Sequence, residues 1–401
     1  MATSDGADGA AVAVADLAPA PAAAGDVAAR ARARLGYAPH PTAERGVLVG
    51  GSRFEGGGAV RFTLDLLDLD QADTGLPSEL QALPLRARVE RAERGLRRLS
   101  LGFLPHGMAL HPRHPTRALW FEKWGDGAAF VDLAEGLLLG KPAPLPGHQF
   151  YGHGAFSPDG ALAYCVETEL GSGRGVISVR DASASGGFAP LGELPSHGMK
   201  PHDCVLLLPE KLLAVTNGAG DTLGTPGRVC LIEVETGKLV EQLEVPDRQL
   251  NTGHLTFDSA RNLAVVSAPR DGLPDSHAGG LSLRGWGAPF RTLPRAARAR
   301  MQGETLSVCI DEARALVWAT SPRGAWLTIW SGAGELRRGV ELKSPRGVAL
   351  SLDERVMYVT CGAGSELMAF DPDELMPLER QPSALRVFGG SHVYAWAPPA
   401  P

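Results

Sequence analysis

The stretch HGAFSPDGALAYCVETELGSGRGVISVRDAS (residues 153–183) decides the fold of this chain. It contains an apolar run, an SPDG turn, a second run, a loop and a third run, and this alternation of β-branched runs and turn dipeptides predicts antiparallel hairpins. Five other segments repeat the pattern, and they begin at His106, His202, His254, Thr305 and Arg346. With the N-terminal runs GVLVGG and AVRFTLDLLDLD, the chain therefore holds about seven units of roughly 50 residues each.

A repeat of this length in an all-β sequence is typical of a β-propeller. We predict one all-β domain over residues 43–401, a propeller of roughly seven blades. The C-terminal run SHVYAWAP (residues 391–398) is expected to pair with an N-terminal strand and close the ring. Such closure removes the exposed sheet edges on which proteins aggregate.

Two segments do not follow the repeat. Residues 1–42 are rich in alanine and proline and predict a disordered tail, with a short helix across Asp26–Leu35. Residues 78–98 are charged and apolar at helical spacing, which indicates a helical insertion. The N-terminus lacks the pattern of a signal peptide, which favours a cytoplasmic location, and a mis-set start site would allow a periplasmic one. No apolar stretch is long enough to predict a membrane span.

Composition excludes several classes of function. The net charge of −6 and the aromatic content of 6% argue against nucleic-acid binding. The sequence contains no P-loop, GxSxG or HExxH motif, so we expect no nucleotide cofactor and no standard hydrolase or metalloprotease centre. The five cysteines form no CxxC pair, and Cys165, Cys309 and Cys361 lie in apolar runs that predict buried free thiols.

Four histidines recur with the period of the blades. His106, His153, His202 and His254 are separated by 47, 49 and 52 residues, and each precedes or begins a strand-like run. Because the start of each innermost strand faces the central channel of a propeller, these imidazoles are candidates for one shared metal site, with iron or copper favoured over zinc. The alternative is a set of separate structural histidines, since side-chain direction reverses at each strand residue and the four positions are not in strict register.

Other residues are candidates for a supporting role. Glu167 and Asn217 end the second runs of two repeats, where they would orient an imidazole. His148 and His197 lie five residues before two of the four histidines and could form a second rim. Arg346 stands where a later blade places its channel residue, as an anion ligand or a partner in an ion pair. We expect the remaining histidines, His111, His114, His277 and His392, to be exposed in loops or near turns.

The motifs also support a family resemblance. The strand endings AYCVE, AVTNG and MYVTCG resemble YVTN-type propeller repeats. Residues 101–275 resemble a bacterial propeller family of unknown function, through FYGHGAFSPDG (150–160), GRGVISVRDA (173–182), KPHD (200–203) and GHL (253–255). Members of that family are usually exported by the twin-arginine route and are often encoded beside imelysin-type iron-uptake proteins. This chain departs from the family in lacking an export signal and in its AGDTLGTPGR loop (219–228).

The sequence leaves three functions open and does not decide whether the chain is an enzyme. The leading hypothesis is a metal-binding propeller with a histidine-lined channel mouth, in a redox or metal-handling role. The second is a non-enzymatic scaffold that binds a protein partner. The third is a metal-free hydrolase or lactonase that uses histidine and glutamate as acid and base. The expected ligand is a metal ion or a small molecule.

Overall fold

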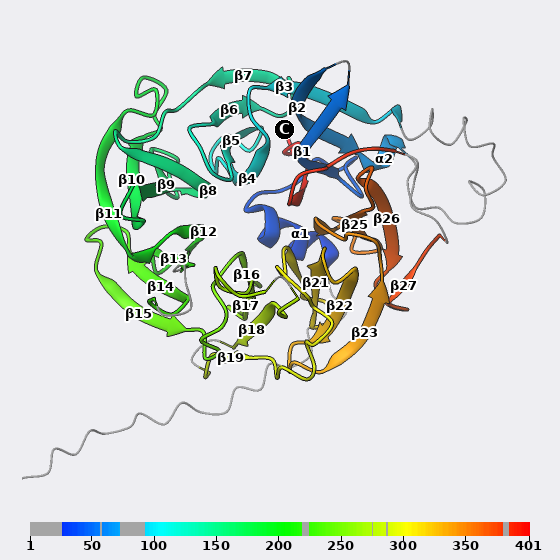
Figure 1. The fold of residues 1–401 in the computed structure, drawn as a ribbon. Coiled ribbons are helices and arrows are strands. Elements are labelled where there is room, and N and C mark those ends of the chain that lie inside the picture. Colours follow the sequence, from blue (N-terminus) through cyan, green and yellow to red (C-terminus); the bar gives the residue numbers. More distant parts are fainter. Residues whose placement is uncertain are drawn as a thin grey trace, which may run out of the picture.

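The chain forms a ring of seven four-stranded antiparallel sheets around a central channel, as Figure 1 shows. The computed structural model describes residues 26–56, 58–72, 93–218, 224–274, 276–285, 288–379 and 385–401. The predicted all-β propeller is confirmed, and its blades number seven.

Blade 1 closes the ring by joining the two ends of the chain. Its innermost strand is β28 (Val393–Trp396), followed outward by β1 (Val47–Gly56), β2 (Ala59–Asp68) and β3 (Leu96–Leu101). Strand β28 runs antiparallel to β1, with Val47 opposite Trp396 and Gly50 opposite Val393. The predicted pairing of the C-terminal run with an N-terminal strand is therefore confirmed.

The other six blades follow one another along the chain, each from its innermost strand outward. Blade 2 contains β4 (Pro105–Leu110), β5 (Arg117–Glu122), β6 (Ala128–Asp132) and β7 (Leu137–Gly140). Blade 3 contains β8 (His148–Phe156), β9 (Leu162–Glu169), β10 (Arg174–Asp181) and β11 (Pro190–Met199). Blade 4 contains β12 (Pro201–Leu207), β13 (Leu212–Asn217), β14 (Arg228–Glu233) and β15 (Leu239–Glu244).

The last three blades have shorter innermost strands. Blade 5 contains β16 (Leu255–Phe257), β17 (Leu263–Ser267), β18 (Gly280–Arg284) and β19 (Arg291–Thr292). Blade 6 contains β20 (Val308–Asp311), β21 (Leu316–Ser321), β22 (Trp326–Ser331) and β23 (Leu336–Glu341). Blade 7 contains β24 (Val348–Leu350), β25 (Met357–Cys361), β26 (Glu366–Asp371) and β27 (Met376–Pro377).

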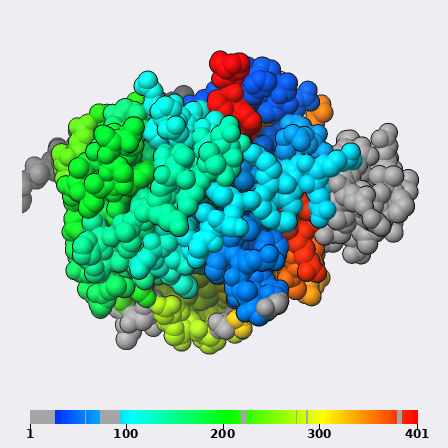
Figure 2. Space-filling model, turned by 90° about the horizontal axis from the view of Figure 1, so that it is seen from above, coloured from blue at the N-terminus to red at the C-terminus, as the bar shows by residue number. Residues whose placement is uncertain are grey.

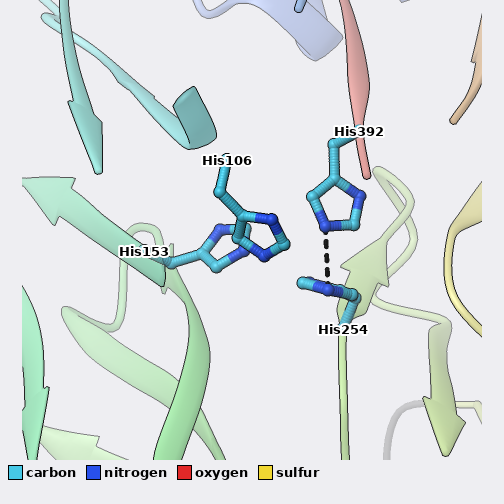
Figure 3. A group of neighbouring side chains, drawn as sticks. All are labelled: His106, His153, His254 and His392. Atoms are coloured by element: carbon cyan, nitrogen blue, oxygen red, sulfur yellow. Dashed lines mark hydrogen bonds between the residues drawn. The ribbon is translucent and has the colours of Figure 1, made fainter. Parts of the chain in front are cut away.

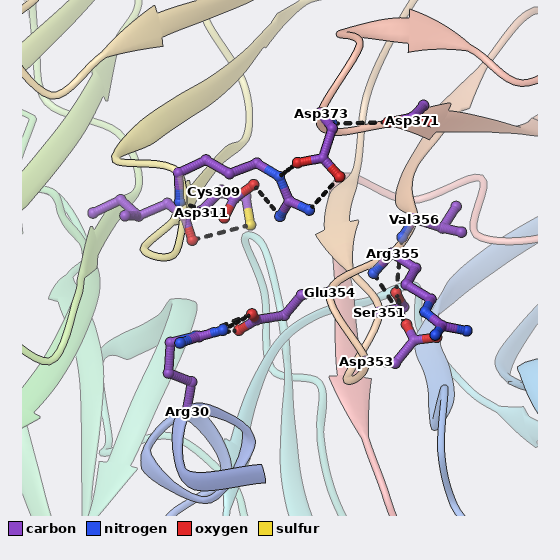
Figure 4. Close-up of polar contacts among 12 residues, drawn as sticks. Arg30, Cys309, Asp311, Ser351, Asp353, Glu354, Arg355, Val356, Asp371 and Asp373 are labelled. Carbon is purple, nitrogen blue, oxygen red and sulfur yellow. Dashed lines mark hydrogen bonds and ion pairs between the residues drawn. The ribbon is translucent and has the colours of Figure 1, made fainter. Parts of the chain in front are cut away.

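The turn after an innermost strand uses the same hydrogen bonds in two distant blades. In blade 3 the Ser157 hydroxyl donates to Asp159 at 2.6 Å and accepts the Leu162 N–H at 2.9 Å. In blade 7 the Ser351 hydroxyl donates to Asp353 at 2.6 Å and accepts the Val356 N–H at 3.1 Å (Figure 4). Each serine satisfies backbone groups that the turn leaves unpaired, which explains why both repeats carry serine and aspartate two residues apart.

Apolar side chains from facing sheets fill the space between blades. The largest fully buried side chains include Trp120, Trp318, Trp330 and Trp396. Full burial of a large apolar side chain stabilises the fold by roughly 1.5–3 kcal/mol. All five cysteines are free thiols; Cys165 and Cys361 are buried as predicted, whereas Cys309 is half-buried.

A short helix lies at one end of the channel. Helix α1 (Val27–Leu35) begins where the Asp26 side chain accepts the Ala29 N–H and ends at Gly36, which has a φ of 79°. Glycine reaches this left-handed conformation without steric cost, which makes it a common helix stop. Ala31 is buried against Leu352 and Ala397, so helix α1 packs on the propeller. The predicted disordered tail, residues 1–42, therefore includes an ordered helix that begins at Val27.

Residues 38–40 lie beside residues 398–400. Figure 2 shows the last residues, in red, lying against N-terminal residues in blue. Pro39 pairs with Pro399, and the Ala400 N–H donates to the Ala38 carbonyl. Residues 1–25 of the predicted tail and residues 78–92 of the predicted insertion lie outside the described residues; residues 96–98 of that insertion belong to β3.

A second helix, α2, spans Leu69–Ala72. No helix in the described part of the chain is both long and apolar enough to cross a membrane.

Candidate metal centre in the central channel

Seven equivalent positions on or just before the innermost strands form a ring around the channel, and four of them are histidines. The positions are His106, His153, Asp203, His254, Ser307, Gly347 and His392 in chain order, and a fifth histidine, His202, stands one residue before Asp203. Each of the five imidazoles is less than a tenth exposed. The structure therefore brings the four predicted histidines together and adds a fifth.

Local irregularities explain why four histidines that are out of strict register converge. The pairing register shifts between Pro105 and Gly107 in β4, between Phe150 and Gly154 in β8, and between Pro201 and Cys204 in β12. Each shift spans one of the histidines. A β-bulge re-aims a side chain without moving the rest of its strand, so three bulges compensate for the imperfect spacing.

One glycine makes room for the rings. Gly152 has a φ of 115°, and a Cβ atom there would lie 3.0 Å from the His106 ring and 3.3 Å from the His202 ring. A side chain at this position would be strained and would push two imidazoles outward. Gly152, the first glycine of the FYGHG motif, is therefore part of the site.

The imidazoles are close enough to share one ion. The Nε2 atom of His254 lies 2.9 Å from Nε2 of His202 and 2.8 Å from Nε2 of His392. One ligand atom from each of His106, His153, His254 and His392 lies within 4.8 Å of the others (Figure 3). Two nitrogen ligands at right angles, each about 2.0–2.1 Å from a metal ion, would be about 2.9 Å apart. The two Nε2–Nε2 separations fit this geometry.

A buried aspartate holds two of the rings. The Asp203 carboxylate lies 3.1 Å from Nδ1 of His153 and 3.3 Å from Nδ1 of His254. It also accepts the backbone N–H groups of Cys204, at 2.7 Å, and Leu255, at 3.1 Å. Because three hydrogen bonds and the close His153 ring hold this carboxylate, it orients both imidazoles in turn.

Two other rings are held by neutral acceptors. Nδ1 of His202 lies 3.0 Å from the Tyr151 carbonyl oxygen. Nδ1 of His392 lies 2.9 Å from the Ser307 hydroxyl, which itself donates to the Ser391 carbonyl at 2.8 Å. A hydroxyl that gives its proton to a carbonyl is left as an acceptor.

These contacts assign the protons of four rings. A neutral imidazole carries one N–H, and in His153, His202, His254 and His392 an oxygen acceptor next to Nδ1 claims it. All four Nε2 atoms are then left as lone pairs, and the two shortest Nε2–Nε2 contacts bring lone pairs together. Nε2 of His153 and of His106 are also buried without any hydrogen-bond partner. Such an arrangement is repulsive unless a cation lies between the nitrogens.

The environment keeps the histidines neutral. Burial lowers the pKa of all five rings, and the neighbouring imidazoles lower it further for His106, His202, His254 and His392. Asp203 partly opposes this effect at His153. Burial also raises the pKa of Asp203, against the effects of His153 and the two backbone N–H groups. Neutral imidazoles are the form that binds metals.

Sequence reasoning missed three residues of this centre. His392 was expected to be exposed, and this was wrong, because the ring closes through β28 and His392 stands immediately before that strand. Ser307 occupies the equivalent position before β20. Both could have been found by continuing the period of about 50 residues beyond His254. Asp203 also lies on the period, 50 residues after His153 and 51 before His254, but the neighbouring His202 drew attention away from it.

Glu167 lies elsewhere. Its carboxylate forms an ion pair with Arg180 at 2.6 Å and accepts hydrogen bonds from the Ser178 hydroxyl and the Leu145 N–H. Both Glu167 and Arg180 are buried inside blade 3. Contrary to the prediction, Glu167 therefore does not contact a channel histidine. Its side chain faces the interior of the blade, where Arg180 balances its charge.

The other predicted supporting side chains also have partners outside the ring. Asn217 is bonded to the hydroxyl and the carbonyl of Ser196. His197 contacts the Gly237 carbonyl, and His148 contacts the Pro146 carbonyl. The second rim is thus not formed, since these residues face the loops of blades 3 and 4.

Arg346, Lys123 and Lys200 lie at the outer mouth of the channel, on the far side of the histidine ring from α1. The Arg346 guanidinium donates to the Gly390 carbonyl at 2.8 Å. Lys123 and Glu304 form an ion pair at 3.5 Å, and Lys200 and Asp271 form another at 3.1 Å. These pairs join different blades and narrow the space above His202 to about 110 Å³.

Comparisons with solved structures support the fold. Kuenenia stuttgartiensis hydrazine synthase has a TM-score of 0.57 and 13% identity, over 78% of this chain and 92% of that one. Dihydro-heme d1 dehydrogenase NirN in complex with DHE has a TM-score of 0.52 and 12% identity, over 84% and 66%. The β-propeller domain of Myceliophteria thermophila Cps50 (Swd1) has a TM-score of 0.54 and 13% identity, over 80% and 97%. At these identities the likeness concerns the fold alone.

Sequence comparison identifies the family. The search of curated proteins finds no match. A family model described as a protein of unknown function, DUF1513, matches residues 103–385, which is most of the chain and includes four of the five channel histidines. The chain therefore belongs to the DUF1513 family, which is a family of unknown function with a seven-bladed propeller fold in this member.

Proposed function

We propose that the five channel histidines bind one redox-active transition metal ion, iron or copper. The observation that carries the proposal is a buried cluster of imidazole nitrogens within 4.8 Å of one another, with two Nε2–Nε2 contacts of 2.8 and 2.9 Å, while oxygen atoms lie next to Nδ1 of four rings. Imidazole is a good ligand for iron, copper, nickel and zinc. Five available imidazoles exceed the four-coordinate set that zinc usually takes, which favours iron or copper.

The chemistry of the site supports a role in electron transfer, oxidation or metal handling. The ligands are neutral, and Asp203 supplies one negative charge next to them. A buried cation would compensate that charge and would be held by orienting contacts on every side. The family resemblance also implies export by the twin-arginine route and genes that lie beside those of imelysin-type iron-uptake proteins. We include both expectations in this proposal.

The first experiment measures metal content. The full chain is purified and loaded with iron(II) or copper(II), and bound metal is counted by inductively coupled plasma mass spectrometry. We expect about one ion per chain in the wild type and none in His153→Ala/His254→Ala, which removes two ligands held by Asp203. The control is His148→Ala/His277→Ala, which removes two histidines outside the ring. Absence of metal after loading, or equal metal in both double variants, would overturn the proposal.

A metal-free hydrolase is the second candidate, and one chain of contacts favours it. Ser307 lies next to Nδ1 of His392, whose Nε2 lies next to His254, whose Nδ1 lies next to Asp203. A serine, a base and an orienting carboxylate are the parts of a nucleophilic hydrolase. Ester hydrolysis that persists in chelator and disappears in Ser307→Ala would favour this function over metal chemistry.

A protein-interaction scaffold has a weaker structural basis. Leu137, Leu138 and Leu139 are each at least 40% exposed on β7, the outer edge of blade 2. An apolar edge strand is a common docking surface. A charged substitution such as Leu138→Lys that abolishes capture of a partner, with metal content unchanged, would support this role.

A further inference from the structure

A chamber lies between the histidine ring and α1. Its volume is about 640 Å³, within the range of small-molecule sites. One end is lined by His153, His254 and His392, together with Asp203 and Ser307. The opposite end is lined by Ala33, Arg34 and Leu35 of α1.

The side walls of the chamber are mainly apolar. They come from the innermost strands of five neighbouring blades: β12, β16, β20, β24 and β28. Representative wall residues are Val205, Leu255, Val308, Val348 and Val393. A mostly apolar wall with polar groups gathered at one end binds a molecule whose body is apolar and whose reacting end is polar.

The charged groups near the α1 end already have partners. Arg261 pairs with Glu210 at 2.6 Å, and the Glu312 carboxylate accepts the Ser259 N–H at 3.1 Å. Arg34 donates to the Leu352 carbonyl and lies 3.5 Å from Glu354. An anionic ligand would thus lose its hydration without gaining an unused positive charge, which is costly.

Helix α1 is fixed over this end of the channel. Arg30 forms hydrogen bonds of 2.6 and 3.0 Å with the Glu354 carboxylate in the turn after β24 (Figure 4). The opposite mouth offers about 110 Å³ and is crossed by two ion pairs. The larger space beside the histidines is therefore on the α1 side.

We propose that this chamber is the substrate site of the histidine centre and binds an uncharged, predominantly apolar small molecule. The proposal rests on the proposed metal function, because the histidine end is where the ligand would react. Binding itself depends on the walls and not on the metal. The two proposals can therefore fail separately.

The test uses the full chain after removal of metal by a chelator, with metal content checked. Binding of naphthol, which is uncharged near neutral pH, is compared by calorimetry with binding of naphthoate, an anion with the same rings. We expect one naphthol per chain and at least about tenfold weaker binding of naphthoate. Val308→Phe should fill part of the chamber and weaken naphthol binding at least about tenfold. The matched control is Val240→Phe, since Val240 is 54% exposed on the outer strand β15.

A second measurement needs no substitution. Cys309 lines the chamber, whereas the other four cysteines are buried. Burial raises the pKa of its thiol to about 11, so alkylation by N-ethylmaleimide should be slow but measurable by mass spectrometry. Naphthol should slow modification of Cys309, and naphthoate should not.

The results separate the possible failures. No naphthol binding, equal binding of naphthoate, or unchanged binding in a folded Val308→Phe variant would overturn the chamber proposal. If that variant does not fold, absence of protection at Cys309 would overturn it. Metal content is measured independently, so a chain that binds naphthol but no metal would retain the chamber and lose the metal centre.

Discussion

Two buried carboxylates, Glu167 and Asp203, differ in what surrounds them. Glu167 faces the Arg180 guanidinium inside blade 3, and the two opposite charges balance each other. The partners of Asp203 are two imidazoles and two backbone N–H groups, and the pKa of both imidazoles is lowered. The first carboxylate has its cation within the fold, whereas the second is surrounded by neutral donors. This difference separates a structural ion pair from a site that would gain a cation.

The largest expected effect is the acid sensitivity of the channel. The folded-state pKa of each ring lies below 6.5, the ordinary value, so the unfolded chain binds more protons as the pH falls below about 6.5. Each histidine then removes up to about 1.4 kcal/mol of stability per pH unit. Asp203, whose pKa is raised, acts in the opposite direction. We expect the metal-free protein to unfold cooperatively in mild acid, as urea titrations at several pH values would show.

A metal-loaded sample is the control for this prediction. Bound metal keeps the imidazoles unprotonated, so loading should move acid unfolding to lower pH. Stability that is flat between neutral pH and pH 5 in the metal-free chain would contradict the assignment of neutral, buried histidines.

Glu167→Gln tests the buried ion pair between Glu167 and Arg180. It leaves the Arg180 charge buried without a counter-charge, and we expect a loss of roughly 3–5 kcal/mol in the free energy of unfolding. Metal content of the folded fraction should not change. Glu169→Gln is the matched control, because Glu169 lies two residues along β9, is partly exposed and pairs with Arg174 at the surface. Its expected cost is much smaller, because solvent screens an ion pair at the surface.

Asp203→Asn tests the other carboxylate. The substitution keeps an oxygen acceptor but removes the charge and one set of imidazole contacts, so metal affinity should fall about 10–100-fold. The metal-free stability should change less than in Glu167→Gln, since no charged partner is left unpaired. Affinity can be measured by competition with a coloured chelator. Asp271→Asn, at the outer mouth, should leave affinity unchanged, and an equal loss in both variants would remove the distinction between the two carboxylates.

Ser307→Ala has the smallest expected effect. It removes the acceptor next to Nδ1 of His392 and should cost about 0.5–1.5 kcal/mol of stability. Metal affinity should fall by less than about tenfold, because His153, His202 and His254 keep their orienting contacts. Ser282→Ala, which removes a hydroxyl bonded to Thr292 in blade 5, should cost similar stability with no effect on metal. A larger metal loss would mean that His392 dominates the site.

Much of the fold was predictable because it depends on local and periodic signals. The alternating runs around SPDG and SLDE gave the hairpins, and the period gave the blades. The histidines at 106, 153, 202 and 254 were predictable for the same reason. Whether they converge was not, since the bulges in β4, β8 and β12 decide their direction.

The supporting residues were predicted less well for a related reason. Glu167 and Asn217 end second strands, and the sequence does not show whether such a position faces the channel or the interior of its blade. The contacts of Asp203 link blades 3, 4 and 5, which no local pattern contains. His392 immediately precedes the closing strand, so its neighbours along the chain differ from its neighbours in space.

The closing strand has a consequence for biosynthesis. His392 stands immediately before β28, so the five-histidine ring stays incomplete until β28 is synthesised and pairs with β1. A product of premature termination before residue 392 would lack both the inner strand of blade 1 and one of the five imidazoles. During translation, domains generally fold as their residues emerge. The full five-histidine site therefore forms only after residues 392–396 have been synthesised, which would prevent a shorter nascent chain from sequestering metal in it.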